Sequence, residues 1–267
     1  MGYMHRPLPL KAEIDGIKIE YLEIGEGRPL LYLHPVDGVH EQLPFLQRLK
    51  SKFRVIAPSH PGFGASELPG RFSAVDDLAY FYLDLMDAMN LRDVVLVGSS
   101  LGGWIASEIA TKCCSRVSHL VLAGSLGCKF GDRETQDVAD YFAVAIPDLP
   151  NFLFHDREAG LAAFNNLDFE SMSDEEILYF TRNREAFALF NWNPNGYNPK
   201  LKARLHRIGV PALVLWGDND RVVPESYGRA YAAVLPKAKF EVIPGSGHYP
   251  HVEKPEAFAD AIISFTR

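Results

Sequence analysis

The sequence lacks several features that would place it in a specialised class of protein. It has only 3 cysteines in 267 residues, Cys113, Cys114 and Cys128, and none has a partner at zinc-ligand spacing. An odd count with two adjacent cysteines does not indicate a disulfide framework, so we expect a reducing compartment. The sequence implies no metal and no organic cofactor. No apolar run approaches the roughly 18 residues of a membrane-spanning helix, and the N-terminal residues show no signal-peptide core. We therefore expect a cytoplasmic protein that does not bind a membrane.

The chain also lacks an excess of basic residues. Its 27 lysines and arginines are outnumbered by 34 aspartates and glutamates, which gives a formal net charge of −7. Proteins that bind nucleic acids usually carry a basic patch or stripe, and the densest basic cluster, over residues 200–207, alternates with apolar residues as on a solvated helix face. We expect a small molecule rather than nucleic acid as the binding partner. A homodimer is left open as the assembly.

Short apolar runs rich in valine and leucine alternate with helical patterns along most of the chain. Such runs suit parallel strands that are covered on both faces. A capping box formed by Ser73 and Asp76 is expected to start one of the helices. The alternation predicts an α/β fold with a mostly parallel sheet and helices on both faces. We expect strands at 17–24, 30–33, 53–57, 94–97, 117–123 and 212–216, and helices from 75, over 100–112, over 225–235 and over 255–265.

The alternation breaks in the stretch 125–202, which shows no convincing strand pattern. In this stretch 13 of 78 residues are aromatic, against 12% of the whole chain. We interpret it as a helical cap inserted into a core domain of residues 1–124 and 203–267. The cap surface that faces the core should be mainly apolar, and we hypothesise that Phe142 and Trp192 line a substrate pocket there.

The strongest motif is Gly98-Ser99-Ser100-Leu101-Gly102, which follows a valine-rich run and precedes a helical pattern. Small residues two positions before and after a serine permit a sharp turn that presents its hydroxyl above the carboxyl end of the strand, with a helix N-terminus facing the developing negative charge. Only Ser100 has a glycine at that distance on both sides, so Ser100 rather than Ser99 is the candidate nucleophile. An ordinary turn between a strand and a helix is the alternative interpretation.

A serine hydroxyl needs a base to accept its proton and a carboxylate to orient that base. His248 lies in a glycine-rich loop before the last expected helix, from which it can reach sideways to the serine. Its rival His251 lies beyond Pro250, close to the start of that helix. Two carboxylates follow the apolar run at 212–216, and we favour Asp220, deeper in its loop, over Asp218.

Two backbone N–H groups are needed to stabilise the oxyanion of an acyl-transfer reaction. Leu101, directly after the nucleophile, should supply one of them. The other should come from the loop that begins at His34, where Val36 is the candidate. Each such donor contributes roughly 3 kcal/mol to transition-state stabilisation. We expect His34 itself to brace the loop rather than to take part in catalysis.

Together these residues resemble the α/β-hydrolase superfamily, in particular its small cap-bearing esterases and carbon–carbon bond hydrolases. The similarity extends over nearly the whole chain and includes the segments 57–66 and 247–250 besides the turn at Ser100. The resemblance implies an eight-stranded, mostly parallel sheet with a helical cap over the active site, and it assigns the catalytic acid to Asp220. The chain has Pro35 where the family usually has glycine, and the oxyanion donor belongs to the residue that follows.

Three functions are compatible with these residues. Related dehalogenases and epoxide hydrolases use an aspartate nucleophile, which Ser100 argues against. The leading hypothesis is a serine hydrolase that cleaves a carboxylic ester, thioester or lactone of a small apolar or aromatic substrate through an acyl-enzyme. The second is a carbon–carbon bond hydrolase of aromatic meta-cleavage products, for which Arg182 or Arg184 could supply a cation, although a solvated helix face is the simpler interpretation. The third is a small-molecule receptor with little or no turnover.

Overall fold

A computed structural model describes residues 8–113, 115–163, 169–192 and 194–267 of the chain. Its eight strands form one sheet in the order β1-β2-β4-β3-β5-β6-β7-β8. The pairs β1–β2 and β2–β4 are antiparallel and all other pairs are parallel, which confirms the expected α/β fold with a mostly parallel sheet. The strands are β1 (Leu10–Ile14), β2 (Ile17–Ile24), β3 (Pro29–Leu33), β4 (Arg54–Pro58), β5 (Val94–Ser99), β6 (Val117–Ala123), β7 (Ala212–Gly217) and β8 (Ala238–Ile243).

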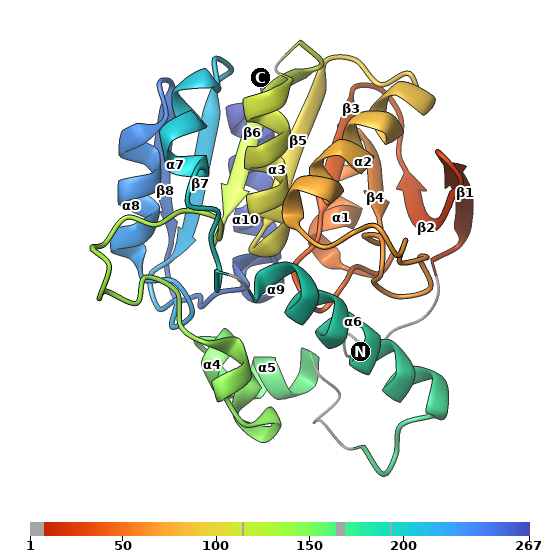
Figure 1. The fold of residues 1–267 in the computed structure, drawn as a ribbon, viewed down its shortest axis with the longest axis vertical. Coiled ribbons are helices and arrows are strands. Elements are labelled where there is room, and N and C mark those ends of the chain that lie inside the picture. Colours follow the sequence, from red (N-terminus) through yellow and green to blue (C-terminus); the bar gives the residue numbers. More distant parts are fainter. Residues whose placement is uncertain (1–7, 114, 164–168, 193) are drawn as a thin grey trace.

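Helices cover both faces of the sheet. Helix α2 packs on α3 and helix α1 packs on α10, and the two pairs lie on opposite faces of the sheet (Figure 1). None of the helices in the described ranges is long and apolar enough to cross a membrane. The helices outside the segment between β6 and β7 are α1 (Pro44–Leu49), α2 (Val75–Ala88), α3 (Leu101–Lys112), α8 (Glu225–Val234), α9 (Pro250–Glu253) and α10 (Pro255–Phe265).

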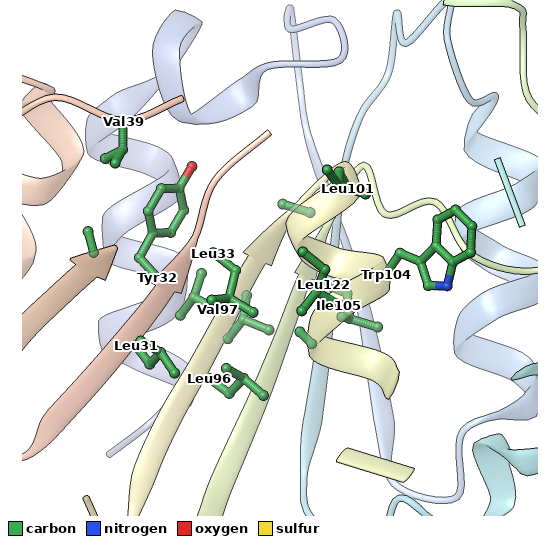
Figure 2. Close-up of a cluster of buried hydrophobic side chains, with 14 of the residues drawn as sticks. Leu31, Tyr32, Leu33, Val39, Leu96, Val97, Leu101, Trp104, Ile105 and Leu122 are labelled. Atoms are coloured by element: carbon green, nitrogen blue, oxygen red, sulfur yellow. The ribbon is translucent and has the colours of Figure 1, made fainter. Parts of the chain in front are cut away.

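The hydrophobic core extends over both faces of the sheet, and one part of it lies where the central strands meet α3. All residues of β5 and β7 are buried, as expected for parallel strands covered on both faces. Figure 2 shows Leu33 of β3, Val97 of β5 and Leu122 of β6 close to Leu101 and Ile105 of α3. This packing fixes the carboxyl end of β5 and the first turn of α3, and Ser100 stands between the two.

Helix α2 starts at Val75 as expected, but its capping box differs from the sequence-based expectation. The N-cap position is Ala74, whose backbone is extended at φ −144° and ψ 159°. The third helical residue is therefore Asp77, and its carboxylate accepts hydrogen bonds from the backbone N–H groups of Ser73 (2.8 Å) and Ala74 (2.9 Å). Asp76, the carboxylate expected in the capping box, instead forms an ion pair with Lys112 at 2.8 Å. The capping carboxylate is thus one residue later than predicted.

The described part of the segment between β6 and β7 contains helices and single turns and no strand longer than an isolated bridge. Helices α4, α5 and α6 lie near the carboxyl ends of the parallel strands (Figure 1). The proposed cap limits at 125 and 202 stay a prediction. The elements are η1 (Tyr141–Ala143), η2 (Ile146–Asp148), α4 (Leu149–Leu153), α5 (Arg157–Ala163), α6 (Asp174–Asn191), α7 (Leu201–Arg204) and η4 (Leu205–Arg207).

Buried polar contacts attach α6 to the core of the molecule. The Asn183 side chain accepts a hydrogen bond from the Gly64 N–H at 2.8 Å. The Tyr179 hydroxyl donates to a Glu20 carboxylate oxygen at 3.0 Å, and Arg182 donates to the Ser66 carbonyl at 3.0 Å. These contacts fix the rotation of α6 about its axis, and so they decide which of its side chains face the active site.

Candidate active site

Ser100 occupies the sharp turn between β5 and α3 that the sequence predicts. Its backbone has φ 53° and ψ −115°, a conformation that residues other than glycine rarely adopt. A Cβ atom at Gly98 would lie 2.2 Å from the Gly102 carbonyl oxygen, and one at Gly102 would lie 2.0 Å from the Leu33 carbonyl oxygen. Both positions therefore need glycine because backbone atoms fill the space that a side chain would occupy.

The structure joins the three predicted triad residues in one hydrogen-bonded chain. Ser100 Oγ lies 2.9 Å from His248 Nε2, and His248 Nδ1 lies 2.8 Å from Asp220 Oδ2. The other oxygen of Asp220 accepts the N–H groups of Val222 and Val223, both at 2.9 Å, which fixes the carboxylate. This geometry suits an imidazole that carries its proton on Nδ1 and accepts the serine proton on Nε2.

The alternative residues have other contacts. Asp218 Oδ1 accepts the N–H groups of Gly245 (2.8 Å) and Ser246 (3.2 Å), so Asp218 shapes the loop that carries His248. The ring of His251 packs among aromatic rings, 5.5 Å from Phe45 between centroids. Burial lowers the pKa of His251 to about 3. The structure thus brings Asp220, and neither alternative residue, into the hydrogen-bonded chain.

The loop with the predicted oxyanion donor Val36 is held by its preceding carbonyl group. The Pro35 oxygen lies 2.6 Å from His34 Nδ1 and accepts the Gly38 N–H at 3.2 Å. In a trans peptide the C=O and the following N–H point in opposite directions. Anchoring the Pro35 oxygen therefore turns the Val36 N–H away from His34, and Val36 borders the cavity at Ser100. The donor roles of Val36 and Leu101 stay predictions.

His34 and His60 form a stacked pair that braces this loop. Their ring centroids are 3.6 Å apart, the His60 N–H donates to His34 Nε2 at 2.9 Å, and His60 Nε2 donates to the His34 carbonyl at 3.0 Å. His60 Nδ1 contacts the Tyr82 hydroxyl. Burial lowers the pKa of His34 to about 4 and that of His60 well below its usual value, so both rings are neutral near pH 7. His60 lies inside the motif at 57–66, but its role was missed.

Sequence reasoning also missed a link between the two active-site loops. The hydroxyl of Tyr249, the residue after His248, donates to Asp37 Oδ2 at 2.5 Å. Burial raises the pKa of Asp37 to about 6, while this hydrogen bond and the charge of Arg184 act in the opposite direction. Asp37 follows Val36 directly. An acidic residue in so apolar a loop is the sequence feature from which a buried partner for Asp37 could have been predicted.

A small cavity lies beside Ser100, between the core and the segment that we interpret as a cap. Its volume is about 10 Å³, which is room for roughly one water molecule. A substrate must therefore displace side chains from their present positions. The core contributes Val36, Ser100, Val222, His248 and Tyr249 to its walls, and the residues between 125 and 202 contribute Leu126, Val138, Ala139, Tyr141, Leu153, Phe187 and Asn191.

The structure corrects the assignment of Phe142 and Trp192 to the lining of this cavity. Phe142 packs behind two lining residues, with ring centroids 5.4 Å from Tyr141 and 5.8 Å from Phe187. Trp192 is 69% exposed and borders a different surface groove. Successive helical residues are rotated by about 100°, so the helix face that points Asn191 into the cavity turns Trp192 away from it.

Within the described ranges, no three histidine, cysteine, aspartate or glutamate side chains are grouped so that they could hold a metal ion. The hydrogen-bonded chain at the site consists of the Ser100 hydroxyl, the His248 imidazole and the Asp220 carboxylate. Such a set is suited to acyl transfer by a serine nucleophile.

Comparisons with known proteins identify relatives of similar length and fold. A 2-hydroxy-6-oxo-6-(2'-aminophenyl)hexa-2,4-dienoic acid hydrolase of Metapseudomonas resinovorans is 28% identical over 266 residues, covering 94% of this chain and 88% of the relative. The structure is similar to a meta-cleavage product hydrolase from Pseudomonas fluorescens IP01, with a TM-score of 0.79, 21% identity and 97% of both chains covered. It is also similar to a thermophilic esterase from Thermogutta terrifontis, with a TM-score of 0.71, 23% identity and coverage of 96% and 97%.

At these identities the two structural similarities show the fold alone. The sequence profile of the alpha/beta hydrolase family, however, matches residues 30–261, which is most of the chain and includes Ser100, Asp220 and His248. The strand order, the turn at Ser100 and this match lead to one conclusion: the chain belongs to the alpha/beta hydrolase family.

Proposed function

We propose that the protein is a serine hydrolase that cleaves a carboxylic ester, thioester or lactone of a small, largely apolar or aromatic substrate. The observation that carries this proposal is the hydrogen-bonded chain from Asp220 through His248 to Ser100, with the serine on a strained turn. A serine hydroxyl paired with an oriented imidazole is the arrangement that activates serine for attack on an acyl carbon.

In the proposed reaction, Ser100 Oγ attacks the carbonyl carbon of the ester while His248 Nε2 accepts the hydroxyl proton. The carbonyl oxygen becomes an oxyanion, which the N–H groups of Leu101 and Val36 stabilise. The carbon–oxygen bond to the leaving group then breaks, and the imidazolium returns the proton to the departing alcohol. Water, deprotonated by His248, hydrolyses the acyl-Ser100 and releases the acid. Asp220 orients the imidazole and stabilises its charged form.

The composition of the cavity supports a mainly apolar substrate. Most of its walls are aliphatic or aromatic, and the segment between residues 125 and 202 contributes the apolar side chains of Leu126, Leu153 and Phe187. Complete burial of one medium-sized apolar group contributes about 1.5–3 kcal/mol to binding. We infer that a butyryl or aromatic acyl group is preferred to acetyl.

Carbon–carbon bond hydrolysis of an aromatic meta-cleavage product is the second candidate. It is favoured by the relative whose name gives a 2-hydroxy-6-oxo-dienoic acid as its substrate. Of the two arginines considered for the carboxylate of such a substrate, Arg182 donates to the Ser66 carbonyl. Arg184 Nη1 is buried and has no hydrogen-bond partner among the described residues, so Arg184 is the better candidate.

These functions can be tested by measuring steady-state kcat/KM values for a set of substrates. The set consists of p-nitrophenyl acetate, butyrate and benzoate, an aliphatic lactone, an acyl thioester and 2-hydroxy-6-oxo-6-phenylhexa-2,4-dienoate. Ester, thioester or lactone turnover that Ser100→Ala abolishes supports the proposal. A kcat/KM for the dienoate well above all of these values supports the second candidate instead. Saturable binding without Ser100-dependent turnover of any compound would point to the receptor hypothesis.

A further inference from the structure

Two polar atoms at the wall of the cavity have no hydrogen-bond partner in the part of the chain that the structure describes. The Tyr141 hydroxyl and Asn191 Oδ1 are buried, their residues are 4% and 3% exposed, and neither atom has a partner among the described residues. Both residues border the cavity that contains Ser100 and His248. Buried polar groups in native proteins are almost always hydrogen-bonded to protein or to ordered water. Two such atoms at one cavity therefore mark a position for a hydroxyl-sized polar group, which a water molecule fills in the free protein and a substrate group can take over.

Tyr141 and Asn191 are both neighbours of Phe187 in the cavity wall. Asn191 follows Phe187 by four residues on α6, which places both on the same face of the helix. The Tyr141 ring packs edge-on against Phe187, with centroids 5.4 Å apart and planes at 82°. The Asn191 amide is oriented by its Nδ2, which donates to Asn195 Oδ1 at 2.8 Å. Its oxygen is therefore left as a hydrogen-bond acceptor.

The Tyr141 hydroxyl supplies the complementary donor. Burial raises the pKa of Tyr141, and the negative charge of Asp37 raises it further while Arg184 acts in the opposite direction. The hydroxyl thus keeps its proton. The Arg184 guanidinium lies over the ring at 4.9 Å and its contact with the hydroxyl lowers the pKa of Tyr141, although no described residue reaches the oxygen at full hydrogen-bonding geometry. A guanidinium N–H can only donate to the Tyr141 oxygen, so the O–H is still available as a donor.

We propose that the substrate carries a hydroxyl group that accepts a hydrogen bond from Tyr141 and donates one to Asn191. The inference rests on the proposed function, and it narrows the substrate class from an apolar ester to an ester with one hydroxyl on an otherwise apolar group. A hydroxyl is the smallest group that both accepts and donates. An alkyl group would leave both protein atoms unsatisfied, and a carboxylate would set an acceptor against the Asn191 oxygen.

Two matched pairs of esters test the proposal on either side of the scissile bond. The first pair is p-nitrophenyl butyrate and p-nitrophenyl 3-hydroxybutyrate, and the second is propyl butyrate and 2-hydroxyethyl butyrate, followed by acid release. After correction for the uncatalysed rates, the hydroxylated ester should have a kcat/KM at least about 10-fold higher in one pair, because a site built to hydrogen-bond a hydroxyl discriminates against its absence. An alkyl ester that is equal or better in both pairs overturns the proposal.

Tyr141→Phe removes only the unpartnered oxygen. The ratio of kcat/KM values for the hydroxylated and alkyl esters should fall by about 10-fold, whereas Tyr80→Phe, at a position that is 54% exposed on α2, should leave the ratio unchanged. The melting temperature of Tyr141→Phe should equal or exceed that of the native protein, since no hydrogen bond between described residues is lost. An unchanged ratio, or a marked loss of stability, contradicts the proposal.

These measurements separate the inference from the proposed function. Ser100-dependent hydrolysis without a preference for hydroxylated esters overturns the inference and leaves the serine hydrolase intact. Absence of Ser100-dependent hydrolysis with every ester contradicts the proposed function and, with it, the inference.

Discussion

Ser100 holds a backbone conformation that costs about 1–3 kcal/mol for a residue other than glycine, and its neighbours hold it there. Its N–H donates to the Ala123 carbonyl at 2.9 Å, and its carbonyl accepts the N–H groups of Gly103 (3.0 Å) and Leu126 (3.2 Å). These bonds come from β6, α3 and the segment after β6. The turn is therefore fixed by three separate parts of the chain rather than by its own sequence alone.

Replacing Ser100 should reveal this strain. Ser100→Gly should have a free energy of unfolding about 1–2 kcal/mol higher than Ser100→Ala, because glycine adopts a φ of 53° without the Cβ penalty. The strain that glycine relieves in the folded state should exceed the entropic cost of having a glycine in the unfolded chain. Urea unfolding of the two inactive variants measures it, and equal or lower stability of the glycine variant would mean that the turn is not strained.

Replacement by asparagine should affect activity differently at Asp220 and at Asp218, which both lie between β7 and β8. Asp220→Asn should lower kcat by several orders of magnitude. The N–H groups of Val222 and Val223 keep the amide oxygen on their side, so the NH2 group faces His248 Nδ1, donates to it and leaves the imidazole in the wrong tautomer. Asp218→Asn should have a mild effect because its oxygen still accepts the Gly245 N–H. Steady-state kinetics with a p-nitrophenyl ester compares them, and similar losses in both variants would leave the acid unassigned.

The buried carboxyl of Asp37 predicts a pH-dependent stability. Its pKa is raised from 3.8 to about 6 by burial. The folded state therefore binds more protons than the unfolded state in this range, and the free energy of unfolding contributed by Asp37 falls as the pH rises through it. A pKa difference of one unit between the folded and unfolded states corresponds to about 1.4 kcal/mol, so the change in the free energy of unfolding over the whole titration is about 3 kcal/mol.

Asp37→Asn removes this titration while an amide oxygen can still accept from Tyr249. Relative to the native protein, the variant should therefore gain up to about 3 kcal/mol between pH 4 and pH 8. Chemical unfolding at both pH values tests this, and a difference in stability that is the same at pH 4 and pH 8 would contradict the assigned pKa.

At the residue scale, the sequence was informative where a local pattern marks a position. Ser100 has glycines at fixed distances, and His248 lies in a glycine-rich loop, so both could be placed. Asp37 pairs with Tyr249 across 212 positions, and such a contact leaves no local pattern. The assignment of Trp192 failed because the rotation of α6 is set by its polar contacts with the core.

At the scale of elements, the oxyanion loop shows how one proline is accommodated. The family's usual glycine is replaced by Pro35, and the loop keeps its shape through the stacked rings of His34 and His60. The carbonyl oxygens of His34 and Pro35 are both held by imidazole nitrogens of this pair. We infer that the pair positions the Val36 N–H.

His34→Ala should therefore act mainly on catalysis through the loop. We expect kcat to fall by about 10- to 100-fold with a smaller change in KM. This is less than the loss in kcat of about 10²–10³-fold that follows removal of a whole oxyanion donor, because the Val36 N–H is displaced and not removed. Tyr82→Phe, which removes only a hydroxyl from the far side of His60, is the control and should affect kcat less. A variant that is less stable but has an unchanged kcat would limit His34 to a structural role.

The elements themselves differed in how well they could be predicted. Strands β2 and β6 and helix α10 have the bounds expected from the apolar runs. Strand β1 was not predicted because it lies at the sheet edge and most of its residues are exposed or half-buried, so it has little apolar pattern. The amphipathic pattern of helix α6 is not evident in the sequence, because the apolar Leu178 is 58% exposed whereas the polar Asn183 is buried.

At the scale of the whole molecule, the active site is assembled from distant parts of the chain. Ser100 and His248 are 148 positions apart and meet because parallel strands bring their carboxyl ends to one edge of the sheet. Periodicity and the chain order of the motifs were enough to predict this meeting. The cavity could not be predicted, since it depends on how the residues between 125 and 202 pack over that edge.

The central claim is that Ser100 is a nucleophile activated by His248. Labelling with a fluorophosphonate, followed by mass spectrometry of the intact protein and of its peptides, tests it most directly. We expect one adduct per chain on Ser100, retained in Ser99→Ala, absent in Ser100→Ala and slowed by at least about 10³-fold in His248→Ala. Labelling of Ser99, or His248→Ala that reacts at the native rate, would contradict the account.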